Sequence, residues 1–329
     1  MIKSYFLKND NGVAVEFCNS GGRIYSIKLA KDGIQTDIIA GAPTIKQYIE
    51  QDEYMGAICG RYANRISNSS FSLNGNQYCL SNNENKNHLH GGFKGFNQKK
   101  WTVNKLYQNT NRAYKLEYLS EDGEEGYPGN LSVVLTYELT DNNEFIIDLK
   151  AETDKSTIIN LTSHPYFNLK GYGNIFDHKL KIIADNYCPV DEDLIPTGEI
   201  FSVDNTDLDF RSEKFISDIY LNRGSCGLDR NFVLRKEKDS LSLAAILHHP
   251  GTNRSLELYT TQSCLQVYTG KHFNYKKMTG KNDLPLKPFD AVALEAQNYP
   301  DAPNKDKFED AYLKAGEIYH QKIVYKFIF

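Results

Sequence analysis

Three neighbouring stretches in the middle of the chain alternate apolar and polar side chains, and this pattern constrains the fold most strongly. The stretches are Tyr114–Leu119, Leu131–Thr140 and Phe145–Lys150. A period of two is typical of a β-strand with one buried face, whereas a helix would need a period near 3.6. The short polar turn Asp141–Asn143 joins the last two stretches. The pattern therefore predicts an antiparallel hairpin with one face toward solvent and the other toward a core.

Strand and turn signals continue through the rest of the chain. The Asn74-Gly75 pair predicts a two-residue hairpin turn, and residues 321–329 alternate again. One short helix is expected within 44–54, after a Thr44 cap. No repeat, low-complexity segment or flexible linker divides the sequence. We therefore predict an all-β fold, a large antiparallel β-sandwich with few short helices, that forms a single domain over residues 1–329.

Composition narrows the class of partner and the compartment. The 329 residues carry a formal net charge of −4, and 24% of them are charged. This balance does not indicate a nucleic-acid or membrane partner, and no apolar run approaches the length of a membrane span. The N-terminal residues lack a signal-peptide pattern. We expect a cytoplasmic protein with reduced, mostly buried cysteines, because all six are scattered without a CxxC pair: Cys18, Cys59, Cys79, Cys188, Cys226 and Cys264.

A histidine follows a strand pattern at residues 157–164. The alternation in this stretch predicts a strand, and Pro165 ends it because proline has no N–H to donate to a sheet. The imidazole of His164 is therefore expected at the end of a stiff element, where a ligand could reach it. A histidine at a strand end is also often an ordinary hydrogen-bonding residue, so its role depends on whether the rest of the chain supplies a partner.

Three further polar clusters interrupt the strand pattern. GRYANRI at 60–66 holds two arginines and an asparagine, and His88 and His90 would share one face of an extended segment. Glu295 is the single carboxylate in an otherwise apolar strand. A carboxylate in such a place must be paired or hydrogen-bonded, and partial desolvation raises its pKa toward the range useful for a general base. An inter-strand salt bridge would explain Glu295 equally well.

Several enzyme classes fit these clusters poorly. A metal site of His88, His90 and His164 lacks a nearby further ligand, so we predict no bound metal. Ser163 adjoins His164 but lies in no GxSxG elbow, and neither a GxGxxG nor a Walker loop follows a strand. The remaining polar residues are histidine, arginine, asparagine, glutamine and one carboxylate. This set suits the binding of a polyhydroxylated ligand and the movement of protons on it.

An ordered set of motifs resembles the aldose 1-epimerase (galactose mutarotase) family. The motifs run through nearly the whole chain in the family's order, and together they are specific although each alone is weak. They are GRYANRI at 60–66, LHGG at 89–92, KGF at 94–96, GEEGYPGNL at 123–131, LTSHPYFNL at 161–169, IPTGEI at 195–200, DFR at 209–211, GLDRNFVL at 227–234, LQVYTG at 265–270 and LEAQNYPDAPN at 294–304.

The resemblance implies a reaction and a pair of catalytic residues. Members of the family have a large antiparallel β-sandwich and interconvert the α and β anomers of free aldoses such as galactose and glucose, without a cofactor. By resemblance, Glu295 is the general base that takes the proton of the C1 hydroxyl, and His164 is the general acid that protonates the ring oxygen. The resemblance also implies a set of substrate-binding residues: Arg65, His90, Asp229, Gln266, Asn64 and Tyr166.

Two departures from the family pattern leave alternatives open. Arg230 and Lys271 add positive charge beside two of the motifs, so a hexose-6-phosphate 1-epimerase is one alternative. A non-catalytic carbohydrate-binding protein on the same fold is another, because a fold does not determine chemistry. The expected partner is a small sugar, and the protein is expected to be a monomer or homodimer.

Overall fold

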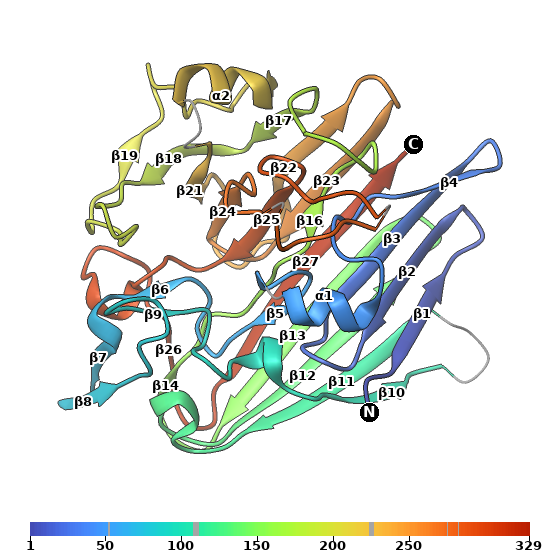
Figure 1. Cartoon of the computed structure of the whole chain (residues 1–329). Helices are drawn as coiled ribbons and strands as arrows, with labels where there is room; N and C mark the ends of the chain where they lie inside the picture. Colours follow the sequence, from blue (N-terminus) through green and yellow to red (C-terminus); the bar gives the residue numbers. More distant parts are fainter. Residues whose placement is uncertain (52, 108–111, 224–226, 275, 282) are drawn as a thin grey trace.

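A nine-stranded antiparallel sheet forms one layer of the protein (Figure 1). The structure is a computed structural model that describes residues 1–329 except 52, 108–111, 224–226, 275 and 282. The strands of this sheet, in spatial order, are β10 (Thr102–Lys105), β11 (Ala113–Ser120), β12 (Leu131–Leu139), β13 (Glu144–Thr153), β27 (Ile318–Ile328), β23 (Arg254–Thr260), β22 (Ser242–His249), β17 (Lys179–Ile182) and β20 (Lys214–Phe215). The three alternating stretches of the sequence are β11, β12 and β13, so the predicted hairpin is confirmed.

Two further antiparallel sheets face this layer. The six-stranded sheet has the order β16 (Tyr166–Phe167), β25 (Val292–Gln297), β24 (Cys264–Tyr268), β21 (Asp229–Leu234), β18 (Ala184–Cys188) and β19 (Phe201–Ser202). The four-stranded sheet runs in chain order through β1 (Ser4–Lys8), β2 (Val13–Cys18), β3 (Ile24–Lys31) and β4 (Ile34–Asp37). Phe167 of the six-stranded sheet packs on Tyr325 of β27 at 5.1 Å between ring centroids. Phe17 of the four-stranded sheet packs on Tyr137 of β12 at 5.0 Å. The predicted β-sandwich is confirmed.

Four short two-stranded sheets among the described residues complete the fold. These pairs are β5 (Ile58–Cys59) with β15 (Thr162–Ser163), β6 (Arg65–Ile66) with β9 (His88–Leu89), β7 (Ser70–Leu73) with β8 (Asn76–Cys79), and β14 (Thr157–Ile158) with β26 (Tyr312–Leu313). The predicted Asn74-Gly75 turn joins β7 and β8, and both of its residues have positive φ as a two-residue hairpin turn requires.

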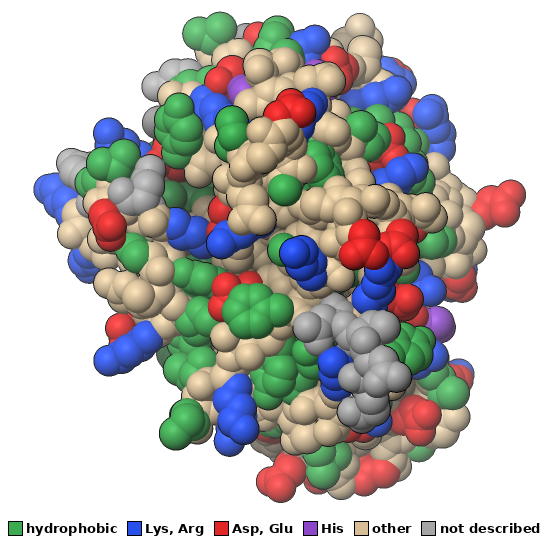
Figure 2. Space-filling view, turned by 90° about the vertical axis from the view of Figure 1, so that its right-hand side faces the viewer, with side chains coloured by type: hydrophobic (Ala, Val, Ile, Leu, Met, Phe, Trp, Pro, Cys, Tyr) green, Lys and Arg blue, Asp and Glu red, His purple; other side chains and the backbone are tan. Residues whose placement is uncertain are grey.

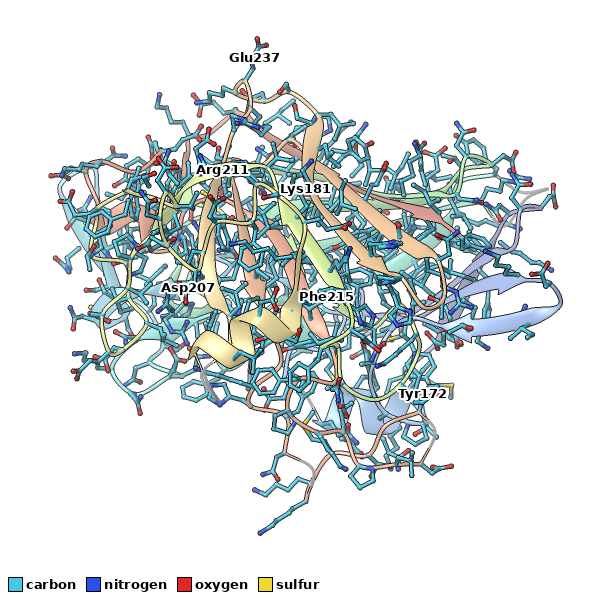
Figure 3. The ribbon with its side chains drawn as sticks, turned by 90° about the horizontal axis from the view of Figure 1, so that it is seen from above. Tyr172, Lys181, Asp207, Arg211, Phe215 and Glu237 are labelled. Atoms are coloured by element: carbon cyan, nitrogen blue, oxygen red, sulfur yellow. The ribbon has the colours of Figure 1, made fainter. Side chains whose placement is uncertain are left out.

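The described residues include two short α-helices, α1 (Ile45–Gln51) and α2 (Ile216–Arg223). Thr44 caps α1 as predicted, because its Oγ1 accepts the Gln47 N–H at 3.3 Å. Helix α2 directly follows β20, and Figure 3 shows this edge of the nine-stranded sheet from above, with Phe215 at the end of β20 labelled. No helix among the described residues is long and apolar enough to cross a membrane.

The expected single strand over residues 157–164 is wrong in its middle. The chain forms two short strands, β14 and β15, and the residues between them pair elsewhere. The Asn160 N–H donates to the Arg61 carbonyl at 3.0 Å, and the Asn160 carbonyl accepts the Ala63 N–H at 2.7 Å. The GRYANRI segment therefore replaces the regular sheet partner of this stretch. The end of the strand at Pro165 is confirmed, because β15 stops at Ser163 and β16 starts at Tyr166.

The cysteines and the surface agree with the composition. Cys18, Cys59, Cys188 and Cys264 are buried free thiols and Cys79 is an exposed one, while Cys226 lies outside the described residues. On the face shown in Figure 2, basic and acidic side chains are interspersed rather than gathered by sign.

Candidate active site

Glu295 and His164 reach the same point from neighbouring strands. Glu295 lies in β25, an interior strand of the six-stranded sheet between β16 and β24 whose six side chains are all buried (Figure 1). His164 lies between β15 and β16. Its N–H donates to the Ala57 carbonyl at 2.9 Å, and its carbonyl accepts the Gly56 N–H at 2.8 Å. Both side chains are therefore carried by backbone that is hydrogen-bonded on either side.

The two side chains form a buried pair. His164 Nε2 lies 3.3 Å from Glu295 Oε1, and the residues are only 3% and 2% exposed. Burial raises the pKa of Glu295 well above its usual value, the nearby Asp229 carboxylate raises that pKa further, and the Arg65 guanidinium opposes both effects. The second carboxylate oxygen, Oε2, has no hydrogen-bond partner among the described residues. A carboxylate oxygen with this environment is well suited to accept a proton from a ligand.

Adjacent strands bring two further predicted residues to the same face. Gln266 of β24 is the register partner of Glu295 in β25. Gln266 Nε2 donates to Asp229 Oδ1 at 2.6 Å, and Asp229 begins the next strand, β21. Three neighbouring strands thus supply a carboxylate, an amide and a second carboxylate in one row. Such a row of donors and acceptors is what the hydroxyl groups of a sugar require.

His90 is fixed as a hydrogen-bond donor by the backbone of Asn64. The backbone N–H of Asn64 donates to His90 Nδ1 at 3.1 Å. The backbone N–H of His90 donates to the Asn64 carbonyl at the same distance. An imidazole that accepts at Nδ1 and is neutral carries its proton on Nε2. Burial is the main cause that lowers the pKa of His90, and His164 and Arg65 lower it further. The ring lies 5.4 Å from the His164 ring, so it is a neutral N–H donor beside the buried pair.

The remaining predicted residues lie around this centre. Arg65 lines a small pocket together with Asn64, Asp229, Arg230 and Gln266. The side chain of Asn64 accepts the Arg65 N–H at 2.8 Å, so Asn64 holds the loop.

Tyr166 and Arg230 contact residues of this centre, and Lys271 follows β24. The Tyr166 ring packs on His164 at 4.9 Å, and its hydroxyl donates to the Glu53 carbonyl at 3.3 Å. Arg230 Nη1 donates to the carbonyl of Asp229 at 2.6 Å. Lys271 is half-buried.

Two residues in the predicted clusters do not join the site. His88 was expected to share a face with His90, but His90 has φ +50°, so the chain turns there instead of staying extended. His88 is fully buried against Tyr127, whose hydroxyl lies 2.7 Å from His88 Nε2. Arg61 points away into the protein, where its guanidinium donates to the carbonyls of Ser120 and Pro128. Both residues are structural.

Sequence reasoning missed three residues that contact the site. The ring of Tyr54 packs on His90 at 4.5 Å and stacks over His164 at 6.3 Å. Asn83 Nδ2 donates to the Tyr54 hydroxyl at 3.3 Å, and Glu84 binds Arg65 through both carboxylate oxygens. Glu84 could have been noticed as the one carboxylate in the asparagine-rich segment SNNENKN at 81–87. Tyr54 gave no such signal in a chain with 22 tyrosines.

A metal ion fits this centre poorly. His90, His164 and Glu295 offer three possible ligand atoms within 4.8 Å of one another. A histidine ligand must present a lone pair, however, and the bond from the Asn64 N–H to Nδ1 leaves the proton of a neutral His90 on Nε2. The donor set therefore suits a ligand with oxygen atoms that accept and release protons.

Comparisons with known proteins identify the family. A sequence model described as aldose 1-epimerase matches residues 3–326. Human galactose mutarotase is 40% identical over 303 residues, covering 90% of this chain and 85% of its own, and Escherichia coli aldose 1-epimerase is 36% identical over 330 residues, covering 98% and 94%. The crystal structure of an aldose epimerase homologue from C. elegans aligns with a TM-score of 0.91 at 29% identity, over 100% of this chain and 99% of that one. Galactose 1-epimerase from Lactobacillus acidophilus aligns with a TM-score of 0.85 at 28% identity over the same shares. This chain belongs to the aldose 1-epimerase family.

Proposed function

We propose that this protein is an aldose 1-epimerase, an isomerase that interconverts the α and β anomers of free hexoses such as galactose and glucose. Relatives at 36–40% identity are named galactose mutarotase and aldose 1-epimerase. The observation that carries the proposal is the buried His164–Glu295 pair at 3.3 Å. We also propose a single domain over residues 1–329, because the main apolar core takes side chains from Leu7 to Phe327.

The spacing of the pair suits the chemistry of an anomeric carbon. Ring opening removes a proton from the C1 hydroxyl and delivers one to the ring oxygen, and both oxygens are bonded to C1. An acid and a base that act on them must therefore be close neighbours. Glu295 takes the hydroxyl proton, protonated His164 gives its proton to the ring oxygen, and the C1–O5 bond breaks to leave an aldehyde. Rotation about C1–C2 and closure with the roles reversed give the other anomer.

The charge of the pair does not change during this cycle. Ring opening starts with carboxylate and imidazolium and ends with carboxylic acid and imidazole, because one proton passes from His164 to Glu295 through the sugar, and ring closure returns it. Burial of both groups excludes water that would otherwise exchange with this proton. His90 and Gln266 supply N–H donors to sugar oxygens, and Asp229 and Arg65 bind the remaining hydroxyls. Proton transfers of this kind need no cofactor.

The charges around the site favour a neutral sugar over a phosphorylated one. Arg65 is already bound by Glu84, and Arg230 donates to the backbone of its neighbour. The carboxylates of Asp229 and Glu295 lie on the same side of the site and would repel a phosphate. A free hexose avoids this repulsion.

Polarimetry on freshly dissolved α-D-galactose and α-D-glucose tests the proposal. The protein should speed the approach to the equilibrium rotation, and Glu295→Gln and His164→Ala should each reduce kcat by about 10²–10⁴-fold. Glu295→Gln should largely retain sugar binding, which calorimetry measures. Glu257→Gln is a matched control, because Glu257 is an acidic residue of β23 that pairs with Lys326 in the other layer. Full activity in Glu295→Gln would show that another group is the base.

A further inference from the structure

The segment at 81–87 builds a support beside the proposed substrate-binding residues. Asn83 binds the backbone of Leu89 twice: its Oδ1 accepts the Leu89 N–H at 2.8 Å, and its Nδ2 donates to the Leu89 carbonyl at 2.9 Å. Leu89 is in turn the register partner of Arg65 in the small β6–β9 sheet. The Asn83 side chain thus makes the two backbone hydrogen bonds to Leu89 that a neighbouring strand would make. The next residue, Glu84, lies beside Arg65.

Glu84 binds the guanidinium of Arg65 through two parallel hydrogen bonds. Arg65 Nε donates to Oε2 and Nη2 donates to Oε1, each at 2.6 Å. The Arg65 side chain is 12% exposed and that of Glu84 is 28% exposed, so the pair is only partly open to solvent. The backbone of Glu84 is held by two hydrogen bonds to Asn87, at 3.1 and 2.8 Å. One carboxylate therefore fixes the plane of the guanidinium and neutralises its charge.

The position of Arg65 makes this neutralisation important for the choice of substrate. Arg65 lines the pocket with Asp229 and Gln266, and its charge lowers the pKa values of both Glu295 and His90. A partly buried guanidinium without a partner is the preferred protein ligand for phosphate, which it binds through the same two parallel N–H groups. Glu84 already occupies two of the five N–H donors, including the Nε–H needed for one such fork.

We propose that Glu84 makes the site select neutral sugars, because it orients Arg65 for hydroxyl groups and denies the guanidinium to phosphate. The proposal rests on the assignment of Arg65 as a substrate-binding residue. Glu84 is a positioning residue in this scheme, since it acts on the sugar through Arg65.

Kinetics of Glu84→Gln with inorganic phosphate as the probe test this role. The KM for galactose should rise about 10-fold, which corresponds to about 1.4 kcal/mol, while kcat changes less than about 2-fold, because Arg65 binds the ground state and the transition state alike. At constant ionic strength, phosphate should inhibit Glu84→Gln competitively and should bind it at least about 10-fold more tightly than it binds the unaltered protein. A merely structural role for Glu84 would not create phosphate inhibition.

The matched control is Glu199→Gln. Glu199 also binds a basic side chain through both oxygens, with Lys307 Nζ at 2.7 and 2.8 Å, but this pair is exposed on the surface. Its KM and its response to phosphate should equal those of the unaltered protein. If Glu84→Gln fails to fold, Glu84→Asp should keep phosphate excluded, because it preserves the charge at the guanidinium.

Two variants separate failure of this inference from failure of the proposed function. If Arg65→Gln leaves the KM for galactose unchanged, Arg65 does not bind the sugar and the assignment beneath the inference is wrong. If Arg65→Gln raises KM but Glu84→Gln gains no phosphate inhibition, the role of Glu84 is overturned. Phosphate inhibition that persists in the double variant Arg65→Gln/Glu84→Gln, and disappears in Arg230→Gln/Glu84→Gln, would overturn it too, by placing the anion on Arg230.

Discussion

Arg61 and Arg65 lie four residues apart in one motif, yet the structure gives them opposite roles that can be measured separately. The Arg61 guanidinium makes four hydrogen bonds in the interior: Nε to Ser120 Oγ at 2.7 Å, Nη2 to the Ser120 and Glu121 carbonyls at 2.7 and 2.8 Å, and Nη1 to the Pro128 carbonyl at 3.0 Å. Arg61→Met keeps an unbranched apolar stem but removes every donor.

The cost of Arg61→Met follows from the acceptors that it leaves behind. Each buried carbonyl that loses its donor costs about 1–3 kcal/mol, and three carbonyls are affected. Removal of a desolvated charge offsets part of this sum, so the free energy of unfolding should fall by about 3–5 kcal/mol. Burial also lowers the pKa of Arg61, in keeping with a guanidinium held only by the protein around it.

Urea unfolding followed by tryptophan fluorescence measures this loss directly. Trp101 is the only tryptophan of the chain and is buried, so its emission reports on the core. Arg65→Met is the matched variant: it should lower the unfolding free energy by less than Arg61→Met does, by about 1–2 kcal/mol, because it breaks one ion pair that is partly open to solvent, and it should raise the KM for galactose. A loss below about 1 kcal/mol in Arg61→Met, or a raised KM with normal stability, would refute the division between the two arginines.

Four further predictions concern protonation, metal and backbone. Because Glu295 must be ionised to act as a base and its pKa is raised, kcat/KM should fall as the pH drops through that raised pKa; Asp229→Asn removes one cause of the rise, so the decline measured by polarimetry should move to lower pH. The pKa of His90 is lowered, so its ring resonances in NMR spectra should stay those of neutral imidazole between about pH 7 and pH 5, where an ordinary histidine titrates; a titration there would contradict the fixed tautomer. Dialysis against EDTA should leave mutarotation unchanged, and activity restored only by added metal would contradict the assignment of His90 as a proton-bearing donor. Gly91→Ala should cost about 3 kcal/mol or more in urea unfolding, because φ is +90° and a Cβ would lie 1.7 Å from the Gly60 carbonyl oxygen.

The sequence predicted what depends on local periodicity. The alternation in β11–β13, the Thr44 cap and the Asn74-Gly75 turn each depend on residues within a few positions, and all three are confirmed. The end of a strand before Pro165 is confirmed for the same reason, since the missing N–H of proline acts locally.

Long-range contacts decided what the sequence could not. His88 and His90 were expected on one face, but the reciprocal bonds between His90 and Asn64 pull the chain into a left-handed turn. Arg61 and Arg65 look alike in the motif, and only the packing of residues 120–128 around Arg61 makes it structural. Glu84 gained its importance from a partner 19 positions away, which periodicity does not reveal.

The place of β27 in the nine-stranded sheet has a consequence for the order of folding. This strand comes after all the others in the chain, yet it lies in the middle of the sheet and pairs with β13 on one side and β23 on the other. Until residues 318–328 arrive, the strands on the two sides of β27 form two separate ribbons, each with an open edge where β27 will pair. Contacts between such distant segments slow folding, and open edges invite pairing with other chains. Substitutions in β27 should therefore reduce the yield of folded protein during expression at moderate temperature. They should alter turnover less, because the strand lies in the layer opposite Glu295.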